Sequence, residues 1–320
     1  MIQDQAREVL ELLVQRVERV VVGKKKEIEL AVIAMLYGGH ILLEDVPGVG
    51  KTLLVRTLAA CVGGSFGRIQ FTSDLQPADV TGVTVYQPLT GSLEFRPGPI
   101  HAHIVLADEI NRAAPRTQSA LLEAMEERKV TVDGVTRELP QPFLLLATQN
   151  PLEYEGTYRL PEAQLDRFLM RLSLGYPKPE QEVEMLSRMQ NPGVEPKPVI
   201  LPEEIRLMQR QVRMVLVDER IKEYLVSVAD ASRRHPKLAL GISPRGTLCW
   251  MGAAQAMAYY RGRSYVIPDD VKEVAEAVLA HRIVLKPDAG FAGMTSPQMV
   301  AELVKQADVP LFHRASGGAS

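Results

Sequence analysis

Residues 40–52 read His-Ile-Leu-Leu-Glu-Asp-Val-Pro-Gly-Val-Gly-Lys-Thr, a short apolar run that enters a glycine-containing loop and ends in Gly50-Lys51-Thr52. This pattern is typical of a buried strand, then a loop whose backbone N–H groups converge, then a helix that begins near Lys51. Such a loop binds polyphosphate. We therefore expect Lys51 to reach the β- and γ-phosphates of a nucleotide and Thr52 to ligate Mg²⁺.

One residue departs from the standard phosphate-loop motif, G-x-x-x-x-G-K-[ST]. Asp45 occupies the position of its first glycine. Gly48 and Gly50 still supply permissive backbone where the loop must curl, and Pro47 stiffens the turn before them. The alternative interpretation of this segment is an ordinary glycine-rich turn between a strand and a helix.

A second element favours the phosphate site. Residues 103–107 form an apolar run that ends in Asp108-Glu109. Beside a phosphate loop, Asp108 would hold Mg²⁺, usually through a water, and Glu109 would polarise the water that attacks the γ-phosphate. An ordinary acidic pair at a strand end is the alternative, but the two elements agree in order and in residue type.

Composition excludes several classes of protein. The 320 residues carry a formal net charge of −2, which argues against a surface built as a whole for DNA or anionic membranes. Cys61 and Cys249 are far apart in apolar helical contexts, so we expect buried reduced thiols. No apolar run approaches the ~18 residues of a membrane span, and the N-terminus lacks a signal-peptide core. We expect a cytoplasmic protein.

The order of elements along the chain predicts an α/β fold. Two amphipathic helices, at about 4–19 and 24–37, precede strand candidates that alternate with helical segments. Such alternation predicts a parallel sheet covered by helices, with phosphate chemistry at the C-terminal ends of its strands. Several of the five strand candidates are near-continuously apolar, as a sheet buried on both faces requires. They lie at 41–44, 68–71, 104–107, 143–147 and 169–174.

Two further segments read as hairpins inserted into this core. Residues 83–95 give two short strands around a turn, and residues 129–137 give a tighter hairpin with Asp133-Gly134 at its tip. The hairpins could be surface decoration or could contact a substrate, and the residues alone leave both interpretations open.

Proline-rich sequence after Tyr176 suggests a domain linker. We predict a nucleotide-binding domain over 1–176, a linker region over 177–202, a helical second domain over 203–310 and a mobile tail over 311–320. Proline at the expected first helical positions, in Ser243-Pro244 and Pro268-Asp269, marks two helix starts in the second domain. Its expected helices span about 203–211, 218–234, 244–260, 269–282 and 296–306.

Four segments together resemble the MoxR family of AAA+ ATPases, over roughly residues 5 to 310. They are 44–52 (Glu-Asp-Val-Pro-Gly-Val-Gly-Lys-Thr), 107–113 (Ala-Asp-Glu-Ile-Asn-Arg-Ala), 147–151 (Ala-Thr-Gln-Asn-Pro) and 160–168 (Leu-Pro-Glu-Ala-Gln-Leu-Asp-Arg-Phe). The resemblance implies a parallel five-stranded P-loop core with helix-2 and pre-sensor-1 hairpin insertions, followed by a small all-α lid domain. Asp45 fits the MoxR-like version of the loop.

The resemblance also implies roles for individual residues. Asn150 matches the sensor that hydrogen-bonds the attacking water or the γ-phosphate. Arg167 matches the arginine finger that enters the active site of a neighbouring subunit, with Arg171 the less favoured candidate. Arg245 matches the second sensor, which reaches from the lid to the γ-phosphate.

Nucleotide contacts follow from the same resemblance. Val22 and Gly23 match the segment that cradles adenine, although Lys24 stands where the family often has Gln. The expected contacts of the phosphate loop are Pro47, Gly48, Val49, Gly50, Lys51, Thr52 and Leu53. The implied cofactors are ATP and Mg²⁺.

The implied function is a Mg²⁺-dependent ATPase that forms a ring, expected to be a hexamer, and couples hydrolysis to chaperone-like remodelling or maturation of protein clients. MoxR-like proteins are associated with partners that carry von Willebrand factor A domains, and such a partner would be a separate chain. A nucleic-acid-translocating motor is one alternative, which the acidic balance opposes. A non-catalytic nucleotide-binding scaffold is the other, which the intact Glu109 and Arg167 oppose.

Overall fold

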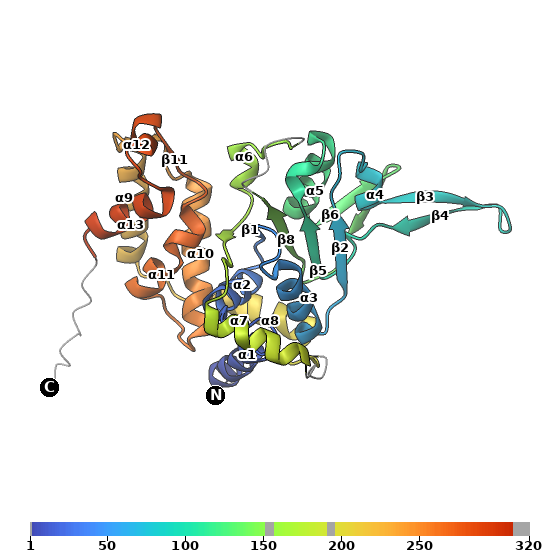
Figure 1. Cartoon of the computed structure of the whole chain (residues 1–320), viewed down its shortest axis with the longest axis horizontal. Helices are drawn as coiled ribbons and strands as arrows, with labels where there is room; N and C mark the ends of the chain where they lie inside the picture. Colours follow the sequence, from blue (N-terminus) through green and yellow to red (C-terminus); the bar gives the residue numbers. More distant parts are fainter. Residues whose placement is uncertain (1, 151–156, 191–195, 310–320) are drawn as a thin grey trace.

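A computed structural model describes residues 2–150, 157–190 and 196–309. Its centre is a five-stranded sheet in which all the pairings are parallel, which confirms the expected α/β fold (Figure 1). The strands lie in the order β2 (Phe66–Gln70), β5 (Ile104–Asp108), β8 (Leu144–Gln149), β1 (Ile41–Glu44) and β9 (Met170–Leu172).

The sheet is buried on both faces, as its apolar strands require. Because successive side chains point to opposite faces, Ile41 and Leu43 of β1 pack on one side and Leu42 on the other. Full burial of a leucine side chain contributes roughly 1.5–3 kcal/mol, so the strands provide a large part of the core. One face packs against α1 (Ile2–Glu18), α2 (Lys25–Tyr37) and α3 (Lys51–Val62), and the other against α4 (Pro77–Thr81) and α5 (Pro115–Glu127).

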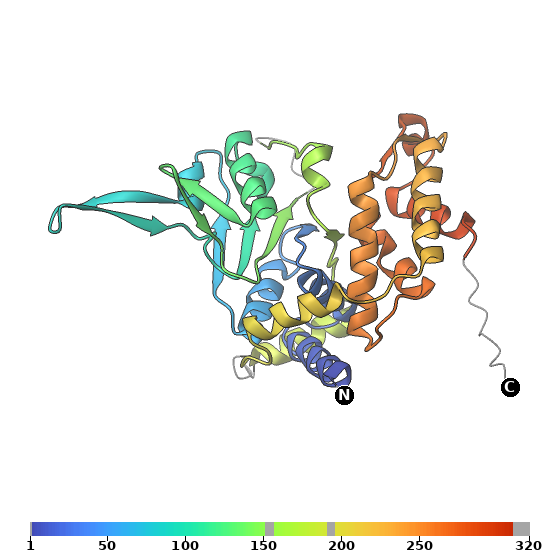
Figure 2. The ribbon, with the colours of Figure 1, turned by 180° about the vertical axis from the view of Figure 1, so that it is seen from behind.

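Both expected hairpins are present. The first pairs β3 (Gly82–Gln87) with β4 (Ser92–Pro97) and projects far from the body of the molecule (Figures 1 and 2). The second pairs β6 (Lys129–Val132) with β7 (Val135–Glu138) and turns at Asp133-Gly134, where both residues have positive φ. The guanidinium of Arg137 in the second hairpin lies 3.8 Å from the ring centroid of Phe95 in the first, so the two hairpins touch.

A helical lid follows the core. Four of its described helices are close to those expected, whereas the short helix Pro287–Phe291 was not expected. Ser243 caps the longest by accepting a hydrogen bond from the N–H of Gly246. Two short strands, β10 (Leu238–Leu240) and β11 (Val284–Leu285), pair within the lid and were not expected from the sequence. The lid helices are α9 (Glu219–Arg234), α10 (Pro244–Tyr260), α11 (Pro268–Leu279), α12 (Pro287–Phe291) and α13 (Ser296–Gln306).

Along the chain, α7 (Pro179–Gln190) and α8 (Pro202–Val212) connect the core to the lid. The core also contains two short elements, η1 (Ile110–Arg112) and α6 (Glu162–Leu165). Because α8 contacts α2 as well as α10, the boundary between the two domains stays a prediction. The expected mobile tail, 311–320, lies outside the described residues. Within the described ranges, no helix combines the length and the apolar character that crossing a membrane would need.

Candidate functional site at the C-terminal ends of the strands

The loop between β1 and α3 opens onto a cavity at the C-terminal edge of the sheet. Gly48 and Gly50 adopt φ values of +86° and +94°. A Cβ at either position would meet nothing within 4 Å, so backbone conformation, not space, requires glycine there. Gly50 directly precedes the first residue of α3, which leaves the first N–H groups of that helix available to an anion.

The cavity has a volume of about 390 Å³ and gathers most of the expected site residues. From the loop and the start of α3 it is lined by Pro47, Gly48, Gly50, Lys51, Thr52 and Leu53. From the ends of β5 and β8 it is lined by Asp108, Glu109, Thr148 and Asn150. The parallel sheet explains this meeting, because the carboxyl ends of its strands share one edge.

Lys51 is held by its own loop. Its ammonium donates to the backbone oxygens of Asp45 at 2.8 Å and Val46 at 3.0 Å. Burial lowers the pKa of Lys51, and the nearby carboxylates of Asp45, Asp108 and Glu109 oppose that shift. The lysine would exchange these carbonyl contacts for phosphate oxygens when a nucleotide occupies the cavity.

Thr148 organises the acidic pair. Its hydroxyl donates to Oδ1 of Asp108 at 2.7 Å and accepts the backbone N–H of Glu109 at 2.8 Å. Glu109 itself has φ +60°, a left-handed conformation that is uncommon outside glycine and concentrates at functional sites. Sequence reasoning did not single out Thr148, although it lies two residues before Asn150, in a segment used for the family resemblance.

Cationic and amide side chains bind the carboxylates of Asp108 and Glu109. Arg68 donates to Oδ2 of Asp108 at 2.8 Å, and Arg112 forms an ion pair with Oε2 of Glu109 at 2.9 Å. Gln70 donates to the same Glu109 oxygen at 3.2 Å. These three partners were not expected. Arg112 could have been predicted as a partner of Glu109, because the two residues are three positions apart in the sequence. Arg68 and Gln70 could not, because they reach the site through the pairing of β2 with β5.

The donor set fits Mg²⁺ bound together with a nucleotide. Thr52 and Asp108 offer hard oxygen ligands in the same cavity. Within the described part of the chain there is no group of three or more His, Cys, Asp or Glu residues that could hold a metal ion alone. Mg²⁺ commonly binds through one or two protein oxygens plus substrate phosphates and waters, which matches this arrangement.

Asp45 has a structural role that explains its departure from the motif. It is buried, and its carboxylate accepts the hydroxyl of Ser173 at 2.9 Å, the N–H of Gly175 at 3.1 Å and the N–H of Leu174. Lys24 holds the same segment by donating to the carbonyl oxygens of Leu174 and Tyr176. The phosphate loop is therefore tied to the chain that leaves β9 for the lid.

Some expected nucleotide contacts lie elsewhere. Val22 and Gly23 line a separate cavity of about 410 Å³, to which Gln181 and Arg188 of α7 also contribute. Val49 packs against the hydrophobic core. The adenine contact of Val22 and Gly23 stays a prediction.

The three candidate arginines do not line the phosphate cavity as it is formed by the described residues. Arg167 and Arg245 both form ion pairs with Glu126 of α5, at 3.1 and 3.0 Å. Arg171 lies in β9 and pairs with Glu44 at the end of β1, at 2.9 Å. The roles expected of these arginines, including that of Arg245 as second sensor, stay predictions.

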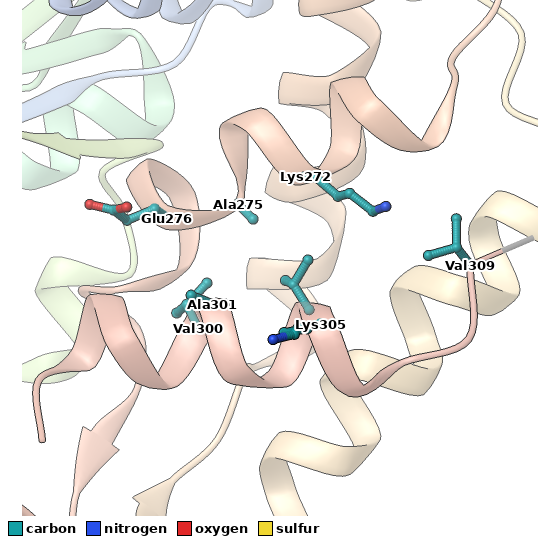
Figure 3. A pocket seen from close by; sticks show the side chains of 8 residues that line it. Lys272, Ala275, Glu276, Val300, Ala301, Lys305 and Val309 are labelled. Atoms are coloured by element: carbon teal, nitrogen blue, oxygen red, sulfur yellow. The ribbon is translucent and has the colours of Figure 1, made fainter.

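A further cavity, of about 400 Å³, lies in the lid between α11 and α13 (Figure 3). Small aliphatic side chains, including Ala275, Val300 and Ala301, share it with Lys272, Lys305 and Glu276. It contains none of the expected site residues.

Comparisons with known proteins match both the core and the lid to known families. Residues 40–170 match the ATPase family associated with various cellular activities (AAA), and residues 230–303 match the AAA lid domain. The chain is 52% identical to the uncharacterized protein YeaC of Bacillus subtilis, over 94% of this chain and 95% of that one. It is 44% identical to the chaperone MoxR1 of Mycobacterium tuberculosis, over 93% and 81%. A solved structure of a candidate ATPase from Cytophaga hutchinsonii superposes with a TM-score of 0.91 at 37% identity, covering 97% of both chains.

Proposed function

Because the chain belongs to the MoxR family of AAA ATPases, we propose that it hydrolyses ATP with Mg²⁺ as a ring, expected to have six subunits, and uses the energy to remodel or mature protein clients. A relative that is 44% identical is named a chaperone, which supports the client class. A separate protein with a von Willebrand factor A domain is the proposed partner.

The chemistry follows from the residues of the cavity. The loop amides and Lys51 would bind the phosphates, and Thr52 and Asp108 would hold Mg²⁺, which would supply positive charge to the phosphates. Glu109 accepts a proton from the attacking water, and Asn150 orients that water or the γ-phosphate. Arg112 and Gln70 both bind Oε2 of Glu109, which holds its carboxylate at the rim of the cavity.

The positions of the arginine side chains support assembly into a ring. Lys51 is the only cation among the described residues that line the cavity. Arg68 and Arg112 lie beside it but pair with its carboxylates. Arg167 and Arg245 meet at Glu126, outside it. Phosphoryl transfer gains ~10³–10⁵ in rate from an arginine placed on the γ-phosphate. A neighbouring subunit can supply that arginine. This supports an active site completed between subunits, with Arg167 favoured over Arg171 because Arg171 is paired with Glu44 beside its own phosphate loop.

The long hairpin supports a protein client. Tyr86 and Leu93 are directly paired across its strands and are 58% and 73% exposed, and Leu89 at the tip is 98% exposed. Glu94 and Arg96 are the only charged side chains between 82 and 97. An apolar, nearly neutral hairpin suits contact with exposed apolar polypeptide better than contact with phosphates along a nucleic acid.

The test measures ATP turnover with a permanently unfolded polypeptide and, separately, with single-stranded DNA. We expect stimulation by the polypeptide, lost in Leu89→Ser. Phe291→Ser is the matched control, since Phe291 is an equally exposed apolar side chain at 90% but lies in the lid. Stimulation by DNA that weakens steeply with salt would instead support the nucleic-acid motor.

A further inference from the structure

Glu126, near the C-terminal end of α5, joins two arginines from distant parts of the chain. Its Oε2 lies 3.1 Å from Nε of Arg167, and its Oε1 lies 3.0 Å from Nη1 of Arg245. Each carboxylate oxygen therefore takes one guanidinium. All three side chains are partly exposed, at 39% for Glu126, 32% for Arg167 and 42% for Arg245, so an approaching anion can reach them.

The chain segments that carry the two arginines are joined by side-chain contacts as well. Asp166, next to Arg167, accepts the hydroxyl of Ser243 at 3.0 Å and Nε of Arg282 at 2.8 Å. Ser243 caps α10, in which Arg245 is the second residue. The segment that carries Arg167 and the helix start that carries Arg245 are thus held as one unit.

The Glu126 contacts leave donors on both arginines. A guanidinium has five N–H donors in a planar fork, and each ion pair with Glu126 engages a single nitrogen. Two guanidinium groups brought to one carboxylate would repel each other without its charge. A terminal phosphate, with oxygens on several sides, is the anion that two adjacent arginines bind well.

We propose that Glu126 is a positioning residue that holds Arg167 and Arg245 as one fork for the terminal phosphate of a nucleotide bound by the neighbouring subunit. The inference rests on the proposed function, because it requires an active site shared between subunits. Glu126 acts through the two arginines and touches neither nucleotide nor water.

This role separates turnover from nucleotide affinity. Glu126 is not among the described residues that line the cavity of its own chain. Glu126→Gln keeps the size of the side chain and removes its charge, so we expect KM for ATP to stay within about twofold. Because misplacement of a catalytic group by about 1 Å can cost ~10²-fold, kcat should fall roughly 10- to 100-fold. Glu127→Gln is the matched control, since the adjacent Glu127 pairs with Lys129 at 3.6 Å and with neither arginine.

The deciding experiment mixes two inactive chains. Arg167→Ala keeps a nucleotide site but presents no finger, and Lys51→Ala presents the finger but binds no nucleotide. Mixed, they should regain turnover at interfaces where Arg167 of one chain meets the nucleotide of the other. Glu126→Gln is then added to one chain at a time. Binding of a fluorescent ATP analogue to the Glu126→Gln single variant confirms that the substitution leaves the fold intact.

We expect Glu126→Gln to reduce the recovered turnover at least tenfold when it is placed on the Lys51→Ala chain, and to have no effect when placed on the Arg167→Ala chain. A general structural defect would not depend on which chain carries it. Equal recovery in both placements would overturn the role of Glu126 and leave the shared site standing. No recovery in the parent mixture would overturn the shared site, and the inference with it.

Discussion

A substitution of Arg282 tests directly whether contacts from the lid stabilise the segment that carries Arg167. Its side chain is 1% exposed and pairs with Asp166, and it also donates to the carbonyl oxygens of Leu169 at 2.9 Å and Phe168. His281, the preceding residue, contacts the Phe168 carbonyl through Nε2 at 3.1 Å. Replacing Arg282 by methionine keeps much of the buried volume but removes the only cation paired with Asp166 among the described residues, together with the Arg282 hydrogen bonds to the carbonyl oxygens.

The expected loss follows from burial. Removing one partner of a buried ion pair costs about 3–5 kcal/mol, because the remaining charge is left uncompensated. Asp166 is 22% exposed and can recover some hydration, so we expect the lower end of this range, about 3 kcal/mol. With a urea dependence of about 3 kcal/mol per molar, the unfolding midpoint would shift by roughly 1 M.

Urea unfolding followed by the fluorescence of Trp250 provides the assay. Trp250 is the only tryptophan, is fully buried in α10 and donates to the carbonyl of Val271, so it reports on the lid. Arg234→Met is the control, because Arg234 pairs with Asp230 on the surface and should contribute under about 1 kcal/mol. If Arg282→Met cost no more than this control, the lid would not fix the segment that carries Arg167.

Three further outcomes follow from the site and the core. Burial lowers the pKa of His40 to about 4, so as the pH falls the unfolded chain binds a proton near pH 6.5 whereas the folded chain does not. The free energy of unfolding should therefore fall by up to about 3 kcal/mol between pH 7 and 4. His40→Gln should flatten this dependence in denaturation measured across the same pH range. Asp45→Gly restores the standard motif yet removes a buried acceptor of three hydrogen bonds, so thermal denaturation should reveal a loss of about 3 kcal/mol, and no loss would contradict the role assigned to Asp45. Lys51→Ala should abolish nucleotide binding in calorimetry, whereas Glu109→Gln should still bind and lose ~10²–10⁴-fold in turnover, a split that unchanged turnover in Glu109→Gln would refute.

Local sequence was sufficient to predict the strands of the sheet and the meeting of the phosphate loop with the acidic pair. The apolar run at 41–44 marks β1 because a strand buried on both faces needs continuous apolar residues, and Asp133-Gly134 marks a hairpin because both residues accept positive φ. Asp108 and Lys51 could be expected to meet because parallel strands end at one edge. The pairing of β10 with β11 was missed, since strands of three and two residues are too short to display a periodic pattern.

Long-range packing decided the rest. Glu126 gave no sign in the sequence that it would join Arg167 and Arg245, because that contact depends on the angle of the lid against α5. Arg68 reaches Asp108 only through the register of β2 with β5. Asp45 was recognisable as a departure from the motif, but its hydrogen-bond partners at 173–175 lie far from it in the sequence, near the end of the core domain.

The proposed ring requires a neighbouring subunit to complete each active site. The decisive measurement is ATP turnover per subunit against protein concentration, with mass measured in parallel by light scattering, for the native chain and for Arg167→Ala. We expect turnover to rise with assembly and to fall by at least ~10³-fold in the variant, which still binds nucleotide. Turnover that is independent of concentration and unchanged by Arg167→Ala would mean that each subunit hydrolyses ATP alone, and would contradict the shared site.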